Sequence, residues 1–362
     1  MFHYFFLPLV EDFNFLNLFN YLTFRAGGAL FTAFLISILL GPKLIRGLKK
    51  LQKKGQPIRE DGPKSHLINK VGTPTMGGML ILVSLFISII LWSDITSKLV
   101  WLVFTITILF GLLGAVDDYK KLKSNSPKGI DGTNRLIIEF FISFVFIFYL
   151  NSILDRNLIN IIFIPFTKGY FIDLGLFYYL FGSIVIVGCA NAVNLTDGLD
   201  GLAIGPIMIS ALSFAFFAYF TGNLIYSDYL KIPYVSDTGE LVIICASLIG
   251  AGLGFLWFNA PPAMVFMGDT GSLSMGGTIG AIAVVTKHEL ILIIVGGIFV
   301  LEALSVFAQV ISFKLTGKRI FKMAPIHHHF EQKGWSESTI VIRFWIIAII
   351  LALIGLASLK LR

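Results

Sequence analysis

Long apolar runs separated by short polar segments recur along the whole chain. A run of about 20 apolar residues can cross the hydrocarbon core of a bilayer as one α-helix. We therefore predict an all-α polytopic integral membrane protein whose single transmembrane domain covers residues 1–362. The ten predicted transmembrane helices are Gly27–Ile45, Met76–Trp92, Lys98–Val116, Leu136–Leu154, Leu176–Asn194, Leu202–Phe220, Leu241–Phe258, Met275–Thr286, Leu290–Phe313 and Ile340–Leu359.

Two further segments do not have the pattern of a span. Residues 1–20 are rich in aromatic side chains, but Glu11 and Asp12 interrupt them. They lack a basic start and a small-residue cleavage site, so we expect an interfacial helix rather than a signal peptide. The segment Asp155–Gly175 is rich in β-branched and aromatic residues, which indicates a short hairpin.

The distribution of charge orients the predicted spans. The chain is 56% hydrophobic and 14% charged, and its net charge of +7 is typical of a positive-inside bias rather than of nucleic-acid binding. The loops on one side of the predicted membrane hold 20 of the 28 Lys and Arg residues. That side is therefore cytoplasmic, and both termini are periplasmic. Cys189 and Cys245 lie at depths that differ by roughly 10 Å, which excludes a disulfide bond between them.

Four polar motifs follow or precede apolar runs, and this orientation brings all four to the cytoplasmic face. They are Gly114–Tyr119 (GAVDDY), Asn191–Gly201 (NAVNLTDGLDG), Phe266–Ser272 (FMGDTGS) and Pro325–Glu331 (PIHHHFE). An isolated acidic turn is usually solvated, but four such motifs at one mouth indicate an active site at the cytoplasmic face. Gly198 and Gly201 permit a tight turn and a close approach of ligand.

The carboxylates at this mouth predict a cation site. The five aspartates are Asp117, Asp118, Asp197, Asp200 and Asp269, and crowded ionised carboxylates repel one another unless cations lie between them. Mg²⁺ takes one or two carboxylates together with waters and substrate phosphates, so this oxygen-rich mouth suits it. The alternative for Asp117 or Asp118 taken alone is a helix cap or an ion pair with a neighbouring lysine.

Basic and aromatic residues supply the second half of the predicted site. Lys70 precedes a glycine-rich turn and has two interpretations, either a contact to phosphate or nucleotide or a solvated positive charge. For Arg135 a functional and a purely structural role are likewise both open. The adjacent histidines 327–329 cannot all face one way, so not all three are ligands; at a phosphate site a histidine can donate to developing charge or transfer a proton. Phe266 could stack on a flat base or belong to the core. Glu302 is isolated within a predicted span, either as a packing partner or as a functional residue.

The motifs VGTPTMGG, GAVDDYKK, NAVNLTDGLDGL, FMGDTGS and APIHHHFEQKGW resemble those of the phospho-N-acetylmuramoyl-pentapeptide transferase family. That family lies within the polyprenyl-phosphate sugar-1-phosphate transferase superfamily, and the resemblance extends from Gly28 to Leu361. It implies that UDP-N-acetylmuramoyl-pentapeptide and undecaprenyl phosphate react to give lipid I and UMP, the first membrane step of peptidoglycan synthesis. It also implies Mg²⁺, a multi-pass location in the bacterial inner membrane and a homodimer.

The same resemblance implies roles for individual residues. The catalytic residues would be Asp117, Asp118, Asp269 and His327, with Asp269 and Asp117 as metal ligands. The residues around uridine would be Lys70, Gly198, Leu199, Asp200, Asn259 and Phe266. Thr75, Asn194 and Asp197 would line the adjoining pocket, and His327 and His328 would contact the phosphate or sugar. Arg135 stands where we place a lysine of the family, so its role as a substrate contact stays open.

Alternatives remain open for both mechanism and function. The lipid phosphate could attack directly, with Asp117 orienting or deprotonating it, or the reaction could pass through an aspartyl-phosphate. One alternative function is transfer of N-acetylglucosamine-1-phosphate to a polyprenyl phosphate. Another is a transporter with an acidic mouth, although a transporter is expected to place its polar residues near the bilayer midplane.

Overall fold

The computed structural model describes residues 1–52, 55, 70, 72–124, 126–167 and 169–360, and helices dominate it. The helices are α1 (Phe2–Phe6), α2 (Leu22–Leu51), α4 (Gly78–Trp92), α5 (Lys98–Ser124), α6 (Gly132–Ile153), α7 (Phe177–Thr196), α8 (Ile204–Thr221), α9 (Leu224–Leu230), α10 (Leu241–Asn259), α11 (Gly268–Val285), α12 (Glu289–Val295), α13 (Gly297–Thr316), α14 (Ile326–Glu331) and α15 (Glu337–Ala357). Short 3₁₀ turns occupy Leu7–Leu9, Asn14–Asn20, Arg156–Leu158 and Thr238–Glu240.

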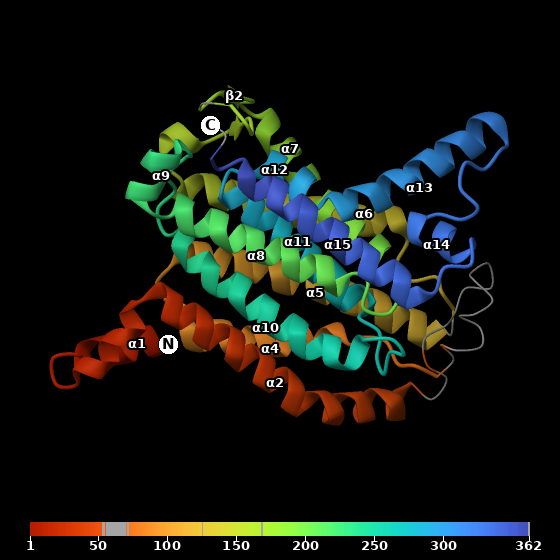
Figure 1. Ribbon diagram of the computed structural model, residues 1–362, viewed down its shortest axis with the longest axis horizontal. Helices are drawn as coiled ribbons and strands as arrows, with labels where there is room; N and C mark the ends of the chain where they lie inside the picture. Colours follow the sequence, from red (N-terminus) through yellow and green to blue (C-terminus); the bar gives the residue numbers. More distant parts are fainter. Residues whose placement is uncertain (53–54, 56–69, 71, 125, 168, 361–362) are drawn as a thin grey trace.

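The long helices run side by side as one bundle, with the chain ends toward the left of Figure 1 and α14 toward the right. Within the described residues, eight helices are long and apolar enough to cross a membrane, namely α2, α5, α6, α7, α8, α10, α13 and α15. The apolar helix α4 has 15 residues and is shorter than a full span. The protein is therefore a multi-pass membrane protein, while the sequence predicts ten spans.

Most helices end a few to several residues away from the predicted bounds, and two of the predicted spans differ in a way that matters for the site. The eighth, predicted at Met275–Thr286, is part of α11, which begins at Gly268 and so carries Asp269 in its first turn. The ninth, predicted at Leu290–Phe313, is divided at Gly296 into α12 and α13. Glycine weakens a helix interior, which accounts for the break. Beyond it, α13 diverges from the bundle (Figure 1).

The helix α11 forms the centre of the bundle, and its residues 270–285 are all buried. Two glycines on neighbouring helices allow its first turns to come close. A Cβ atom at Gly114 of α5 would lie 2.2 Å from the Asp269 carbonyl oxygen, and one at Gly78 of α4 would lie 2.2 Å from the Gly271 nitrogen. The backbone of α11 therefore contacts α4 and α5 directly, which fixes the position of the Asp269 side chain.

The remaining segments confirm one prediction and correct another. The predicted hairpin is present as the antiparallel strands β1 (Ile161–Phe163) and β2 (Phe171–Asp173). The predicted interfacial helix over residues 1–20 is instead the five-residue α1 followed by 3₁₀ turns, because the ring of Phe2 packs on Phe6, Phe19 and Trp92. Both cysteines are free and buried, as predicted.

Candidate active site at one end of the bundle

Asp118 is a structural anchor for the start of α11. Its two carboxylate oxygens accept hydrogen bonds from the backbone N–H groups of Asp269 and Thr270, at 3.2 and 3.0 Å, and from the Thr270 hydroxyl at 2.7 Å. A carboxylate at a helix N-terminus satisfies N–H groups that the helix itself leaves unpaired. The position of Asp118 thus determines where the Asp269 side chain points.

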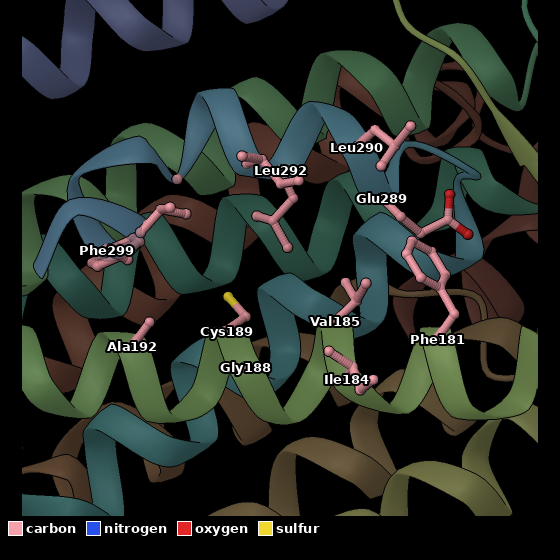
Figure 2. A pocket seen from close by; sticks show the side chains of 13 residues that line it. Phe181, Ile184, Val185, Gly188, Cys189, Ala192, Glu289, Leu290, Leu292 and Phe299 are labelled. Atoms are coloured by element: carbon pink, nitrogen blue, oxygen red, sulfur yellow. The ribbon is translucent and has the colours of Figure 1, made fainter. Parts of the chain in front are cut away.

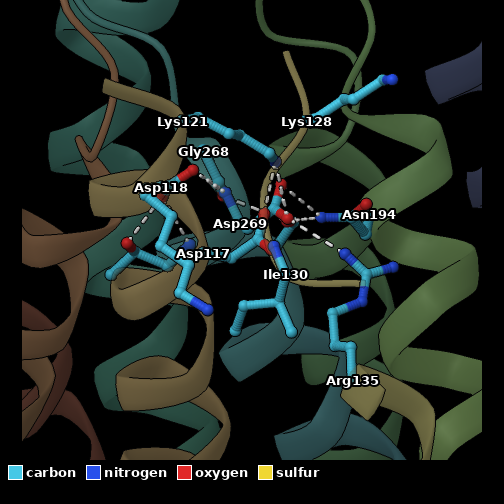
Figure 3. A network of polar contacts seen from close by, with 12 residues as sticks. Asp117, Asp118, Lys121, Lys128, Ile130, Arg135, Asn194, Gly268 and Asp269 are labelled. Atoms are coloured by element: carbon cyan, nitrogen blue, oxygen red, sulfur yellow. Dashed lines mark hydrogen bonds and ion pairs between the residues drawn. The ribbon is translucent and has the colours of Figure 1, made fainter. Parts of the chain in front are cut away.

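Asp117 and Asp269 share one ammonium group, and Figure 3 shows the network around them. The Lys121 Nζ atom lies 2.6 Å from Asp117 Oδ2 and 3.0 Å from Asp269 Oδ2. The other Asp269 oxygen accepts a hydrogen bond from the Asn194 amide at 3.0 Å, and the other Asp117 oxygen accepts one from the Ile130 N–H at 2.6 Å. Cations and amide groups thus relieve the repulsion that the sequence predicts between these carboxylates.

Arg135 contributes a second cation to Asp269. Its Nη1 atom lies 3.1 Å from Asp269 Oδ2, and its Nη2 atom donates to the Asn191 side-chain oxygen at 3.0 Å. Glu139, fully buried one turn along α6, lies 3.5 Å from the Arg135 guanidinium and accepts a hydrogen bond from the Asn191 amide. The role of Arg135, which the sequence leaves open, is therefore that of a guanidinium held by Glu139 and Asn191 in contact with Asp269.

The arrangement of these carboxylates fits a bound Mg²⁺ ion. The Lys121 ammonium occupies the space between Asp117 and Asp269, so this space already accommodates a cation. Among the described residues, no group of three or more His, Cys, Asp or Glu side chains could by itself hold a metal ion. Mg²⁺ needs only one or two carboxylates when waters and substrate phosphates supply its other ligands. Asp117 and Asp269 meet that requirement, whereas Asp118 is committed to α11.

A second polar cluster surrounds Lys70, which we call the lysine cluster and define as Lys70, Asp200, Glu337 and Phe266. Lys70 Nζ lies 2.8 Å from Asp200 Oδ1 and 2.7 Å from Glu337 Oε1, and 5.8 Å from the centre of the Phe266 ring. Glu337 Oε1 also accepts the backbone N–H of Asp200 at 2.7 Å. Burial lowers the pKa of Lys70, but the two carboxylates outweigh that effect and the net result is a raised pKa. Lys70 is therefore a fixed cation beside an aromatic ring.

Three of the predicted pocket residues support the backbone around this cluster instead of lining an open surface. The Asn259 side chain accepts from the Gly201 N–H at 3.0 Å and donates to the Val265 carbonyl at 2.9 Å. The Thr75 backbone exchanges two hydrogen bonds with the Gln52 side chain. Leu199 is buried in an apolar cluster with residues of α15. All three side chains are buried, so they shape the pocket from behind.

The three histidines have three different environments, as their adjacency predicts. The His327 side chain is fully buried, and its Nδ1 atom lies 3.1 Å from Glu302 Oε2. His328 Nδ1 lies 3.0 Å from Glu331 Oε2. The His329 Nδ1 atom accepts a hydrogen bond from the Lys322 N–H at 3.1 Å. The structure does not show the predicted contact of His327 with substrate, because the buried ring packs against the loop at Gly198 and is not accessible from outside.

Asp197 lies between the two clusters and responds to both. Burial, followed by the like charges of Asp269 and Asp118, raises the pKa of its carboxyl group well above the usual value, against the opposing effect of Lys70. A carboxyl group that keeps its proton can donate a hydrogen bond to an anionic ligand, which its ionised neighbours cannot do. The raised pKa makes Asp197 take up a proton more readily than an ordinary aspartate, and in that form it is a hydrogen-bond donor close to the aspartates and Lys70.

We expect the Asp197→Asn substitution to raise the melting temperature by about a few degrees at pH 8, with a smaller gain at lower pH. The unfolded chain ionises this carboxyl near its ordinary pKa of 3.8, whereas the folded protein keeps the proton to higher pH. Above that value the unfolded state binds fewer protons, so the wild type loses stability as pH rises, and asparagine removes the loss. Thermal unfolding from pH 5 to 8 measures it, with the exposed Asp228→Asn as a control. A gain that shrinks as pH rises would contradict the raised pKa.

Several residues of this site were not singled out from the sequence. The sequence indicates Lys121 only as the alternative ion-pair partner of Asp117 or Asp118, and the contact with Asp117 confirms that ion pair; the motifs do not include Glu139, Glu337 or Gln52. Glu337 had a detectable signal, because it is a carboxylate in the first turn of a span on the same face as the motifs. Glu139 and Gln52 gave no such signal, because their roles depend on neighbours distant in sequence.

Comparison with known proteins identifies the family. The profile for Glycosyl transferase family 4 matches residues 99–287, which contain both aspartate motifs and the loop at Gly198. A phospho-N-acetylmuramoyl-pentapeptide-transferase of Maricaulis maris (strain MCS10) is 53% identical over the full length of both chains. Another of Pelagibacter ubique (strain HTCC1062) is 54% identical over 98% of each chain. The chain therefore belongs to glycosyl transferase family 4 and, within it, to the phospho-N-acetylmuramoyl-pentapeptide transferases.

Proposed function

We propose that the protein transfers phospho-N-acetylmuramoyl-pentapeptide from its UDP derivative to undecaprenyl phosphate, which gives lipid I and releases UMP. The observation that carries this proposal is the meeting of two clusters at one end of the bundle. Asp117, Asp269 and their cations suit a pair of reacting phosphates, and Lys70 beside Phe266 suits a uracil base. Asp197 lies between them, where a diphosphate would join the two halves of the donor.

We call Asp117, Asp269, Lys121 and Arg135 the aspartate centre, and its residues would align two anions that otherwise repel. An oxygen of the lipid phosphate attacks the sugar-bearing phosphorus of the donor, and the bond from that phosphorus to the UMP oxygen breaks. Lys121 and Arg135 offset negative charge, and Asp117 orients the attacking phosphate. Bound Mg²⁺, held by Asp269 and Asp117, would supply further charge neutralisation.

The lipid acceptor also requires an apolar surface next to this centre. A cavity of about 250 Å³ lies between α7, α12 and α13, and its lining is almost entirely apolar (Figure 2). Ala192 at one end of the cavity follows Asn191, which bonds to Arg135 of the aspartate centre. A hydrocarbon tail along α7 would therefore bring its phosphate toward Asp269. With the tail so placed, one site would serve a water-soluble donor and a membrane-bound acceptor.

Purified protein should release UMP only when both UDP-N-acetylmuramoyl-pentapeptide and undecaprenyl phosphate are present. Chelation should stop the release and added Mg²⁺ should restore it, because two anionic phosphates must meet beside Asp117 and Asp269. A coupled assay for UMP measures both effects, with the acceptor omitted as the control. Full activity in excess chelator would exclude the metal, and UMP release without acceptor would exclude the transfer.

The site would face the cytoplasm of a bacterium, in a homodimer embedded in the inner membrane with both termini periplasmic. The lysine-rich and arginine-rich loops support this orientation. A cysteine at exposed Lys333 should react with an impermeant label from the cytoplasmic side, and one at exposed Asp228 from the periplasmic side. Native Cys189 and Cys245 are buried and give a low background. Labelling of both positions from one side would contradict the orientation.

A further inference from the structure

Glu302 is a buried carboxylate in α13, a helix most of whose side chains are exposed or half-buried. The residues of α13 on either side of it, Leu301 and Leu304, are 44% and 59% exposed, whereas Glu302 is fully buried. It lies on the narrow inner face of α13 together with Ile298, Phe299 and Ser305. A carboxylate removed from water is costly unless it is paired, so the molecule must contain a partner for it.

That partner is His327 of α14. The Nδ1 atom of His327 lies 3.1 Å from Glu302 Oε2, and both side chains are fully buried. Within the described part of the chain, neither carboxylate oxygen of Glu302 and neither ring nitrogen of His327 has a hydrogen-bond partner, so this close contact is the pairing that the structure shows for both groups. Each group therefore faces the other as its nearest group of opposite charge when the imidazole is protonated. A carboxylate that faces Nδ1 fixes the orientation of an imidazole ring and leaves Nε2 to act on the opposite side.

The opposite side of the ring contacts the loop that joins the two clusters of the site. A Cβ atom at Gly198 would lie 2.2 Å from His327 Nε2, so the ring touches the loop backbone and leaves no space for a side chain. Gly198 stands between Asp197 and Asp200, and the Asp200 backbone N–H bonds to Glu337. The ring is thus held between Glu302 on one side and the loop on the other.

We propose that Glu302 is a positioning residue of the transferase, which acts through His327. By fixing the ring against Gly198, it directs Nε2 toward the loop between the aspartates and Lys70 and keeps that loop in its catalytic position. The inference rests on the proposed function. The inference adds to the proposed function that Glu302, the buried carboxylate of α13, contributes to the rate of transfer and not only to packing.

A double-mutant cycle tests this coupling. Glu302→Gln keeps the size of the side chain and one acceptor oxygen but removes the charge. His327→Gln keeps an amide that can still reach Glu302, so both variants avoid leaving an empty cavity. We expect Glu302→Gln to lower kcat about tenfold to a hundredfold, the loss typical when the carboxylate that orients a metal-ligating histidine is removed. The KM for the donor should change less than about threefold. The double variant should match His327→Gln alone within about twofold, because Glu302 has no effect without the ring.

Controls separate positioning from packing and from the proposed function itself. Ser305→Ala changes a buried side chain one turn along the same face of α13 and should leave kcat within about twofold. Effects of Glu302→Gln and His327→Gln that multiply would overturn the proposal, and so would wild-type kcat in Glu302→Gln. Loss of activity that merely follows a drop in melting temperature, in Ser305→Ala as in Glu302→Gln, would also overturn it. If the wild type itself released no UMP, the proposed function would be wrong, and this result is distinguishable from an effect of the variants alone.

Discussion

Asp269→Asn should lower kcat about a hundredfold to a thousandfold, while the affinity for UMP changes little. Asp269 is the point at which Lys121, Arg135 and Asn194 converge, and its carboxylate shares the Lys121 ammonium with Asp117. Asparagine keeps the shape and one acceptor oxygen but removes the negative charge that holds these cations. The positive charges would then repel one another, and the proposed metal ion would lose its main ligand.

Turnover at saturating substrate and UMP binding by calorimetry measure the two quantities separately. Asp228→Asn makes the same chemical change at an exposed position on α9 and serves as the control. Thermal unfolding should show that Asp269→Asn is folded, because Asp118 still holds the start of α11 through the backbone. Near wild-type turnover in a folded Asp269→Asn variant would remove Asp269 from the catalytic centre.

Phe266→Ala should weaken UMP binding about tenfold to a hundredfold, with kcat at saturation affected much less. The loss of a stacking surface for a base costs about 1–3 kcal/mol. The backbone of Phe266 is fixed on both sides, because its N–H donates to the Pro74 carbonyl at 2.9 Å and its carbonyl accepts from the Gly77 N–H at 2.8 Å. The half-buried ring is therefore preorganised beside Lys70, which strengthens its affinity for a flat base.

The test compares four variants, Phe266→Ala, Phe266→Trp, Phe307→Ala and His327→Ala, by calorimetry with UMP and by turnover. Phe266→Trp keeps an aromatic face and should recover most of the affinity, whereas Phe307→Ala removes an exposed phenylalanine from α13 and should change nothing. One other outcome would show that the site is not divided into a base pocket and a phosphate centre. Normal UMP binding in Phe266→Ala together with its loss in His327→Ala would contradict a base pocket around Lys70.

The sequence alone was sufficient to bring the main site residues together. Charged motifs at the ends of apolar runs must lie at one membrane face once the runs are counted and oriented. The contacts of Asp269 with Arg135 and Asn194 show that these distant motifs do meet. The hairpin and the free cysteines followed from equally local evidence, namely residue type and depth.

The sequence could not determine those features of the site that depend on packing between helices. Asp117 and Asp118 are adjacent, yet one holds a cation and the other holds α11, a division set by the position of the Asp269 backbone. The start of α11 was misjudged because its first turn is polar, which an apolar pattern excludes from a span. Likewise, the burial of His327 by Glu302 requires α13 and α14 to meet, and neither sequence segment indicates this.

A competition between two donors tests the account most directly. The purified protein would receive equal concentrations of UDP-N-acetylmuramoyl-pentapeptide and UDP-N-acetylglucosamine with undecaprenyl phosphate, and mass spectrometry would identify the lipid product. We predict lipid I, with a kcat/KM for the muramoyl donor at least about a hundredfold higher. A product that carries only N-acetylglucosamine, or no lipid-linked product at all from folded protein, would contradict the proposed function.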